Sequence, residues 1–421
     1  MSYLEKLLDG VEVKWKTLGN LAIKITSGGT PDTKKTEYWE NGAIPWMSSG
    51  EVNLKTISET EKFITEAGLK NSSAKLVPEN SVVMALAGQG KTRGQVARTR
   101  IELTTNQSLA ALIFDEKKVS SDYIFHFLET QYENLRQISS GNSGRGGLNL
   151  QMISAYKVPI PCPENPEKSL AIQSEIVRIL DAFTALTAEL TAELTARKKQ
   201  YNYYRDQLLS FDEEQVEWKT LGDLFDFKNG INKEKEFFGR GDKIINFTDV
   251  FKKNKLYEDS IAGKVVTHNS DLERFSCKKG DVFFTRTSET KDEIGYASVL
   301  LSDMDACVFS GFLIRARPIA NNLLPEYCAY CFSSKDIRNK IVASSNMTTR
   351  VTTTGTALSK IKIPIPSLER QLQISQVLDK FETLTRSLTG GLPKEIQLRQ
   401  KQYEYYRDLL FSFPKSDAVS Q

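Results

Sequence analysis

Four loops rich in glycine and small polar residues hold the side chains of this 421-residue chain that are best suited to chemistry: residues 88–95, 139–147, 285–291 and 346–354. Arginine can donate two hydrogen bonds to O6 and N7 of guanine, and asparagine or glutamine can pair with adenine. We therefore predict base contacts from Gln89, Arg93, Asn142, Arg145, Arg286, Asn346 and Arg350, and phosphate contacts from Lys91 and Lys291. The alternative is that these loops are solvated turns, as polar glycine-rich segments commonly are.

Catalytic motifs are missing from the sequence. A phosphate-binding loop needs GxxxxGK[ST], but Ala85 stands where the first glycine before Gly90-Lys91-Thr92 belongs. The sequence has no Asn/Asp-Pro-Pro-Tyr/Phe tetrad of the kind that grips an extruded base, no convincing PD…ExK cluster, and only two histidines, His126 and His268. We infer that the chain binds or organises other molecules and is not itself an enzyme.

The five cysteines are scattered, which favours reduced thiols in a cytosol over a disulfide framework. Cys328 and Cys331 form a CxxC pair, but a structural zinc site would need a second pair or two nearby histidines. We expect buried free thiols and no metal.

Length and composition predict a packed protein with two domains, because 421 residues exceed the usual size of one hydrophobic core. The net charge of +3 neither supports nor excludes a nucleic-acid partner. No apolar run is long enough to cross a membrane, and the start MSYLEKLLDG does not resemble a signal peptide. We expect a cytoplasmic protein.

The sequence segments that must position the loops occur twice in the chain. VKWKTLGNL at 13–21 and VEWKTLGDL at 216–224 share seven of nine residues, and YNYYRDQLLSF at 201–211 and YEYYRDLLFSF at 403–413 share eight of eleven. Between these anchors, IVRILDAF (176–183) corresponds to ISQVLDKF (374–381), and each follows a proline-rich boundary. The segments 22–155 and 225–360 show no comparable similarity. A repeated frame therefore carries two divergent inserts, which implies two different recognition tasks.

Apolar residues at alternating steps of four and three predict a long helix from 170 to 209. At 1.5 Å per residue such a helix is on the order of 60 Å long. The second copy follows the same pattern but is interrupted at Gly390-Gly391-Leu392-Pro393, where we expect a break. The two helical segments are expected to pack antiparallel and to give a pseudo-twofold molecule.

TAELTAEL at 187–194 is a four-residue unit in tandem within the first predicted helix. We interpret it as a length module, since one more copy would extend a helix by about 6 Å and rotate its far end by about 40°. The alternative is simply a run of good helix formers.

These motifs together resemble the specificity subunits of type I restriction enzymes, most closely the IC class. The WKTLG opening, GGTP before IPW, the PIP boundary, the TAEL repeats and GLPKEIQLRQKQYEYYRD carry the resemblance, which covers residues 1–31, 156–224 and 361–413. The second copy departs by its GGLP and by four more residues before Tyr403.

The resemblance implies a non-catalytic subunit whose two inserts each read one half of a bipartite, asymmetric DNA target. It also implies that two methyltransferase subunits, which use S-adenosylmethionine to methylate adenine, dock on the helices, and that two restriction and translocase subunits using ATP and Mg²⁺ join them. The docking residues expected on the helices are Ile176, Phe183, Tyr204, Ile374, Phe381 and Tyr406. The chain itself needs no cofactor. The rival hypothesis is a duplicated coiled-coil scaffold that binds proteins only.

The expected fold class is α+β, with two mixed α/β target-recognition domains separated by two long antiparallel coiled-coil helices in a pseudo-twofold repeat. The expected boundaries are 1–161 and 212–366 for the recognition domains, 162–211 and 367–415 for the helical spacers, and 416–421 for a tail.

Overall fold

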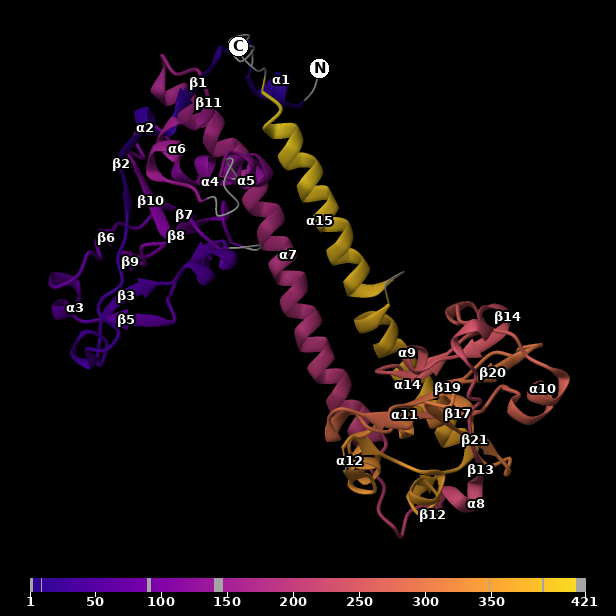
Figure 1. The fold of residues 1–421 in the computed structure, drawn as a ribbon. Helices are drawn as coiled ribbons and strands as arrows, with labels where there is room; N and C mark the ends of the chain where they lie inside the picture. Colours follow the sequence, from indigo (N-terminus) through magenta and orange to yellow (C-terminus); the bar gives the residue numbers. More distant parts are fainter. Residues whose placement is uncertain are drawn as a thin grey trace. The chain divides into compact units, whose positions relative to one another are not determined.

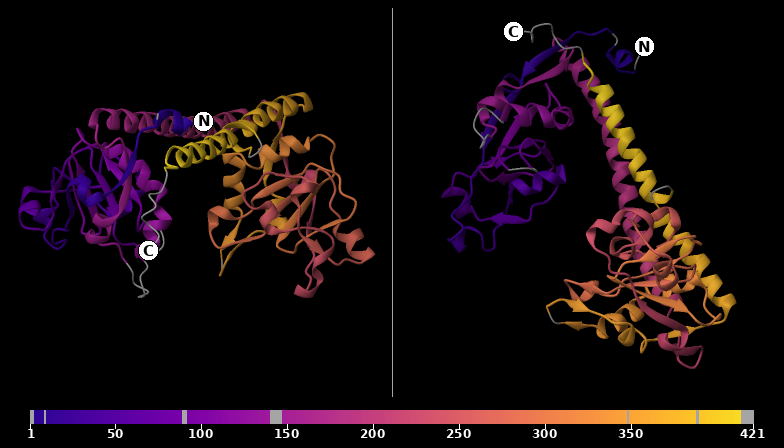
Figure 2. Two further views of the ribbon diagram at one scale, coloured as in Figure 1. Left: turned by 90° about the horizontal axis from the view of Figure 1, so that it is seen from above. Right: turned by 45° about the vertical axis from the view of Figure 1, so that its right-hand side comes forward.

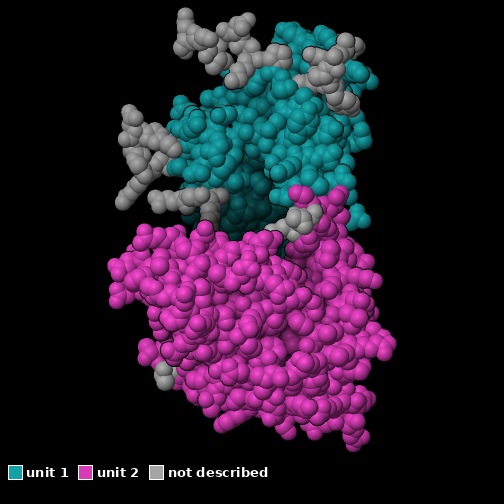
Figure 3. Space-filling model, turned by 90° about the vertical axis from the view of Figure 1, so that its right-hand side faces the viewer, with its two compact units in different colours: residues 1–189, 396–421 teal, residues 190–395 magenta. Residues whose placement is uncertain are grey.

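The chain forms two compact units, each of which combines one divergent insert with parts of both repeated helical segments. The computed structural model describes residues 3–8, 10–88, 92–139, 147–347, 349–387 and 390–413. Unit 1 contains residues 1–189 and 396–421, and unit 2 contains residues 190–395 (Figure 3). Unit 1 therefore takes its last helix from a distant part of the sequence, whereas unit 2 is continuous.

Unit 1 contains two sheets and a short pairing of the frame strands. The frame strands β1 (Val13–Thr17) and β11 (Lys157–Pro161) are antiparallel. The main sheet has the order β2 (Ala22–Ser27), β10 (Leu109–Phe114), β7 (Val82–Ala85), β8 (Val96–Thr99) and β4 (Thr56–Ile57). The second sheet has the order β5 (Lys62–Ile64), β3 (Ile44–Met47), β9 (Leu103–Thr105) and β6 (Leu76–Val77). Helical elements around these sheets are α1 (Tyr3–Leu8), α2 (Leu18–Leu21), η1 (Thr36–Tyr38), η2 (Ser49–Leu54), α3 (Glu66–Lys70), α4 (Ser121–Thr130), α5 (Tyr132–Ser139) and α6 (Leu150–Ala155) (Figure 1).

Unit 2 repeats the frame pairing and the main-sheet topology with a different sequence. Frame strands β12 (Glu217–Thr220) and β24 (Lys362–Ile365) pair as β1 and β11 do. Its main sheet has the order β13 (Phe225–Asn229), β21 (Leu313–Pro318), β17 (Val282–Thr285), β19 (Ala297–Leu300) and β15 (Lys255–Leu256). One smaller sheet has the order β16 (Lys264–Val265), β14 (Phe238–Ile245) and β20 (Cys307–Phe309). Another has the order β18 (Thr287–Ser288), β23 (Val351–Thr352) and β22 (Asn346–Met347). Helical elements are α8 (Leu221–Leu224), η3 (Lys235–Phe237), α9 (Phe247–Val250), η4 (Glu258–Ser260), α10 (Asn269–Phe275), η5 (Lys291–Glu293), α11 (Pro325–Cys331), α12 (Lys335–Ala343) and α13 (Gly355–Leu358).

The two main sheets match strand for strand, including the direction of each pairing. In both, the first three contacts are antiparallel and the last, β4 with β8 or β15 with β19, is parallel. The inserts share no recognisable sequence, yet they share one fold. The duplication predicted for the frame therefore extends through the inserts.

The central strands are buried on both faces, which explains how the sheets pack. In β7, Val82 and Met84 join the core formed with α4 and the long helices, while Val83 and Ala85 join a second core on the opposite face. Because side chains alternate along a strand, one strand supplies both cores. In unit 2, Val282 and Phe284 face one core and Phe283 the other.

Three helices form the spacer predicted from the sequence. α7 (Pro166–Leu208) has 43 residues, which corresponds to about 65 Å at 1.5 Å per residue. Its N-terminus is capped by Asn165, whose side-chain oxygen accepts a hydrogen bond from the Lys168 N–H at 3.1 Å. The second copy is divided into α14 (Leu368–Arg386) and α15 (Gly391–Leu410), as predicted. Gly391 has φ +70°, a conformation that disfavours any residue with a Cβ atom.

Within each unit, α7 runs antiparallel to a segment of the second copy (Figures 1 and 2). In unit 2, Tyr201 contacts Arg386 and Tyr204 contacts Phe381, so the residue numbers rise along one helix and fall along the other. These observations confirm the predicted fold class of two mixed α/β domains with long antiparallel helices. None of the helices in the described part of the chain is both long and apolar enough to cross a bilayer.

Candidate nucleic-acid interface

The structure joins the two predicted loops of the second insert in one small sheet. β18, from the first loop, pairs with β23 through Thr287 opposite Thr352, and β23 pairs with β22 through Asn346 opposite the same Thr352. Because paired residues of adjacent strands face the same side, these three polar side chains share one face. Loops that are more than 50 residues apart in the sequence therefore form a single polar surface.

Arg286 lies at the start of this surface with its backbone held from two sides. Its N–H donates to the Phe312 carbonyl at 2.9 Å, and its carbonyl accepts from the Thr353 N–H at 3.0 Å. The side chain is partly exposed. The backbone is held in place and Nη1 of the guanidinium donates to the Gly311 carbonyl at 3.5 Å, so the side chain is positioned as expected of a group that reads a base edge.

The other predicted residues of this insert lie at the surface. Lys291, Asn346 and Arg350 are exposed. Arg350 forms an ion pair with Glu289 of the opposite loop at 3.2 Å, with both side chains more than half exposed. Such an exposed pair contributes little to stability, so it leaves the arginine able to exchange partners.

In the first insert, the residues directly next to the two loops also meet. Leu86, which follows β7, donates its N–H to the Ser108 carbonyl at 2.8 Å and accepts from the Leu148 N–H at 3.0 Å. These contacts match those of Arg286, which places Leu86 and Arg286 at equivalent positions. Gln89, Lys91, Asn142 and Arg145 lie outside the described residues.

Arg93 lies in a turn closed by a hydrogen bond from the Gln95 N–H to the Thr92 carbonyl at 2.8 Å. The next residue, Gly94, has φ +84° and lies against α5, where a Cβ atom would come within 3.4 Å of Leu135. The ring of Tyr132, at the start of α5, would lie 3.7 Å from the same Cβ atom. The turn is therefore packed on a helix, and Arg93 is only partly exposed.

Four of the six residues predicted for partner docking form two equivalent aromatic stacks. Phe183 of α7 stacks on Tyr406 of α15, with ring centroids 5.3 Å apart, and Phe381 of α14 stacks on Tyr204 of α7 at 5.7 Å. In each unit, the helix of the first copy of the repeat thus packs on a helix of the second copy. Ile176 and Ile374 are only 0% and 1% exposed, so their side chains stabilise the cores and do not reach a surface.

Two exposed tyrosines of the same motif were not predicted. Tyr203 is 62% exposed and Tyr405 is 65% exposed, and each makes an edge-to-face contact with the stacked tyrosine beside it. Beside Arg286, Phe312 is also 62% exposed, and Met347 on β22 is 71% exposed. The tyrosines could have been found from the repeated motif, but nothing in the sequence distinguishes Phe312 from a core residue.

Metal or thiol chemistry finds no support in the part of the chain that the structure describes. Within it, no group of three or more His, Cys, Asp or Glu side chains could hold a metal ion. Cys328 and Cys331 are buried, free thiols on α11, and burial raises the pKa of Cys331 to about 12. A protonated thiol is a poor nucleophile and metal ligand.

Comparison with known families decides the identity of this duplicated frame. Residues 11–197 and 213–398 each match the family described as type I restriction modification DNA specificity domain. The chain belongs to this family. The resemblance inferred from the repeated motifs is thereby confirmed.

Two relatives in this specificity family match over nearly their whole length. The EcoR124I/EcoR124II specificity subunit of Escherichia coli is 38% identical, with 100% of this chain and 99% of the relative covered. The EcoprrI specificity subunit, also of Escherichia coli, is 33% identical, with 92% of each chain covered.

Solved structures of specificity subunits share the fold. A chain from a type I restriction-modification complex superposes with a TM-score of 0.62 over 95% of this chain and 97% of that one, at 13% identity. The specificity subunit from M. genitalium gives a TM-score of 0.51 over 99% and 100%, at 15% identity. The two-unit specificity architecture therefore tolerates almost complete sequence divergence.

Proposed function

We propose that this chain is the DNA-reading subunit of a type I restriction-modification complex and that each unit reads one half of a bipartite, asymmetric target. The observation that carries the proposal is the equivalent junction at Leu86 and Arg286. In unit 2 it joins the two polar loops next to the main sheet, and in unit 1 it joins the residues that directly flank them. Two unlike loop sets on one repeated fold are what two different half-sites require.

In this proposal the chain is non-catalytic and acts in the cytoplasm. Adenine methylation is supplied by two methyltransferase subunits that use S-adenosylmethionine, and cleavage by two restriction and translocase subunits that use ATP and Mg²⁺. Membership in the specificity family supports this division of labour.

A binding experiment on the complex with its methyltransferase partner tests DNA reading. A methylation map of cells with and without the gene identifies the target, and titrations then compare that duplex with a scrambled one over a series of salt concentrations. We expect selective binding that weakens steeply as salt rises, because phosphate contacts release counterions. Equal binding of both duplexes at moderate salt would refute the proposal and favour the protein-only scaffold.

The helical frame is proposed to dock two copies of one partner, because the same exposed aromatic group occurs in both units. Aromatic side chains are enriched at the centres of protein interfaces. Alanine at Tyr203 or Tyr405 is expected to remove one methyltransferase subunit from the purified complex, and alanine at both is expected to remove two.

Native mass spectrometry measures that stoichiometry. Tyr257→Ala is the matched control, because Tyr257 is 46% exposed in unit 2 but lies outside the helical frame. An unchanged stoichiometry in the double variant would exclude docking through these tyrosines.

A further inference from the structure

Each unit contains an aspartate of the repeated helices that is bound by side chains of the divergent insert. These aspartates, Asp181 on α7 and Asp379 on α14, occupy the same position in IVRILDAF and ISQVLDKF. In unit 1, Asp181 pairs with Arg98 of β8, with N···O distances of 2.9 and 3.1 Å, and with Nε2 of His126 of α4 at 2.9 Å. The helix and the insert are thus linked by charged hydrogen bonds.

Unit 2 has the same link made from different residues. Lys255 of β15 donates to Asp379 at 2.6 Å and to Glu382 of α14 at 2.6 Å. The Tyr330 hydroxyl of α11 lies 2.6 Å from the Asp379 carboxylate. Burial alone would lower the pKa of Lys255, but Glu382 and Asp379 outweigh it and raise that pKa. The ammonium ion is therefore held firmly in its charged form.

His126 and Tyr330 occupy equivalent positions, because each lies three residues after a buried tyrosine with one shared contact. Tyr123 donates its hydroxyl proton to the Pro159 carbonyl at 2.7 Å, and Tyr327 donates to the Pro364 carbonyl at 3.0 Å. Pro159 and Pro364 are equivalent residues of the PIP boundaries. The helix keeps one acceptor in both units, while the insert supplies a different donor.

A second pair of frame residues holds the same two helices. Gln173 and Gln371, both 0% exposed, are equivalent in the repeat. Gln173 accepts a hydrogen bond from the Ser120 N–H before α4 at 2.9 Å, and Gln371 accepts one from the Leu324 N–H before α11 at 2.8 Å. The insert of each unit is therefore fixed to its helix at two points, about eight residues or two turns apart.

Two directional attachments restrict rotation in a way that apolar packing alone does not. Partly buried ion pairs add little net stability compared with apolar contacts of the same volume, but they can select one geometry. The frame supplies an aspartate and a glutamine at equivalent positions in both units, with Glu382 as an additional acceptor in unit 2, whereas the donors from the inserts differ. This pattern fits a positioning role that every insert has to satisfy.

We propose that Asp181 and Asp379 are positioning residues that hold each recognition insert at one angle on its helix, and that this angle limits the gap allowed between the two half-sites. The proposal rests on the proposed function. It also implies that an insert transplanted into this frame must bring its own donor to the aspartate.

Mapping of methylated sites by the complex tests the proposal in Asp379→Asn and in Tyr330→Phe, which keeps the ring but removes the hydroxyl. We expect both half-sites to be retained, while methylation of targets with the gap changed by one base pair rises about five-fold, the factor expected for losing one hydrogen bond. Lys255→Arg keeps the charge and should keep the wild-type gap.

Tyr327→Phe is the matched control, because it removes a buried hydroxyl from the same helix without touching Asp379. It should lower stability and leave the gap unchanged. If Tyr330→Phe keeps the gap selectivity of the wild type, the proposal is overturned. This conclusion does not depend on whether Asp379→Asn is active in methylation. A wild-type complex without any defined bipartite target would instead refute the proposed function.

Discussion

Asp181 is a half-buried carboxylate whose charge depends on its neighbours in unit 1. Burial would raise its pKa, but hydrogen bonds from His126 and Arg98, together with their charges, outweigh burial and lower the pKa to about 2. Asp122 also pairs with Arg98 at 3.3 Å, and Glu129 lies 3.8 Å from Nδ1 of His126. The ionised form of Asp181 is therefore the one that binds the insert.

The lowered pKa predicts how Asp181 contributes to stability as the pH changes. A folded-state pKa below the ordinary 3.8 means that the contribution is present above that value and is lost as the pH falls toward 2. At pH 7, Asp181→Asn should destabilise unit 1 by about 1–2 kcal/mol, allowing for solvent screening. Urea unfolding at a series of pH values measures this difference, which should vanish near pH 2. A difference that is the same at pH 2 and pH 7 would contradict the assignment.

Arg286 is the residue through which base reading is most directly tested. Its backbone is held by Phe312 and Thr353, so Arg286→Ala removes the guanidinium without releasing the loop. We expect the affinity for the target to fall by about 1–3 kcal/mol, with relaxed selectivity at one base pair and little change in non-specific binding.

Competition titrations on the complex measure the effect of Arg286→Ala. Lys118→Ala is the control, since it removes one positive charge from a 77% exposed side chain that lies outside the loops. Equal weakening on target and scrambled duplexes would make Arg286 a phosphate contact.

At the scale of elements, the stacked pairs predict which part of α7 each substitution disturbs. Phe381→Ala removes the ring that stacks on Tyr204. We therefore expect the backbone amides of residues 190–208 to lose about 1–3 kcal/mol of protection against hydrogen exchange, the effect of removing a partly buried aromatic side chain. Phe183→Ala is the matched counterpart, because its ring stacks on Tyr406, and it should affect residues 166–189. Hydrogen exchange along α7 distinguishes the two. Equal loss of protection along the whole helix in both variants would contradict packing by separate units.

The sequence predicted the helices and the break at Gly391, because seven-residue patterns and glycine are strong local signals. It did not predict that both inserts share one sheet topology. β7 reads VVMA and β17 reads VFFT, and both are buried on two faces, so neither has the alternation that marks a strand. His126 and Tyr330 likewise have unlike chemistry at equivalent positions, which only the contacts to Asp181 and Asp379 reveal.

The base and phosphate contacts assigned to the loops stay predictions. The structure joins the two loops of the second insert at Arg286, and in the first insert it joins the residues next to the loops at the equivalent Leu86. Which loop residues lie together depends on how segments distant in the sequence approach each other, and a single sequence does not show those approaches.

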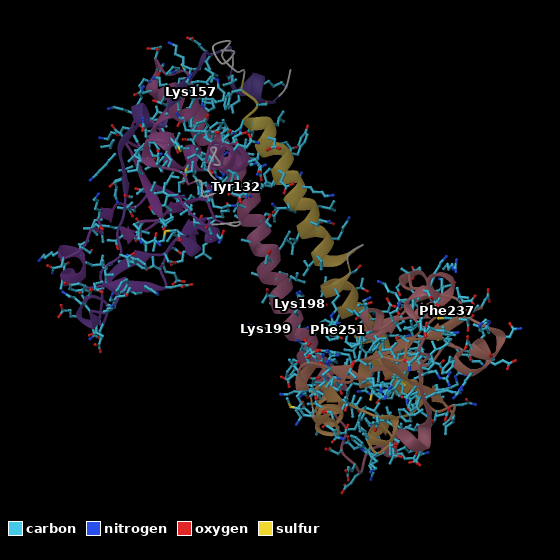
Figure 4. All side chains as sticks on the ribbon, in the orientation of Figure 1. Tyr132, Lys157, Lys198, Lys199, Phe237 and Phe251 are labelled. Carbon is cyan, nitrogen blue, oxygen red and sulfur yellow. The ribbon has the colours of Figure 1, made fainter. Side chains whose placement is uncertain are left out.

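At the scale of the whole molecule, the division between the units falls inside continuous helices. Unit 1 ends at Glu189 and unit 2 begins at Leu190, in the middle of TAELTAEL, and a second division lies between Glu395 and Ile396 of α15. α7 is helical throughout this stretch, and Lys198 and Lys199, which follow the repeat, project into solvent (Figure 4). A change of length at 187–194 therefore acts on one of the two helical connections between the units.

Deletion of residues 191–194 is the sharpest test of the length module. Four residues of helix correspond to about 6 Å and a residual rotation of about 40°. One base pair of B-DNA rotates by about 35°, so the deletion should shorten the gap between the half-sites by about one base pair and leave both half-sites intact. A methylation map of cells that carry the variant measures the gap directly.

Thr191→Ala is the matched control, because it keeps the helix and its length and should keep the gap. If the deletion leaves the gap unchanged while methylation persists, TAELTAEL is only a run of good helix formers. In that case the spacing of the target must come from the angle at which each insert is held on its helix.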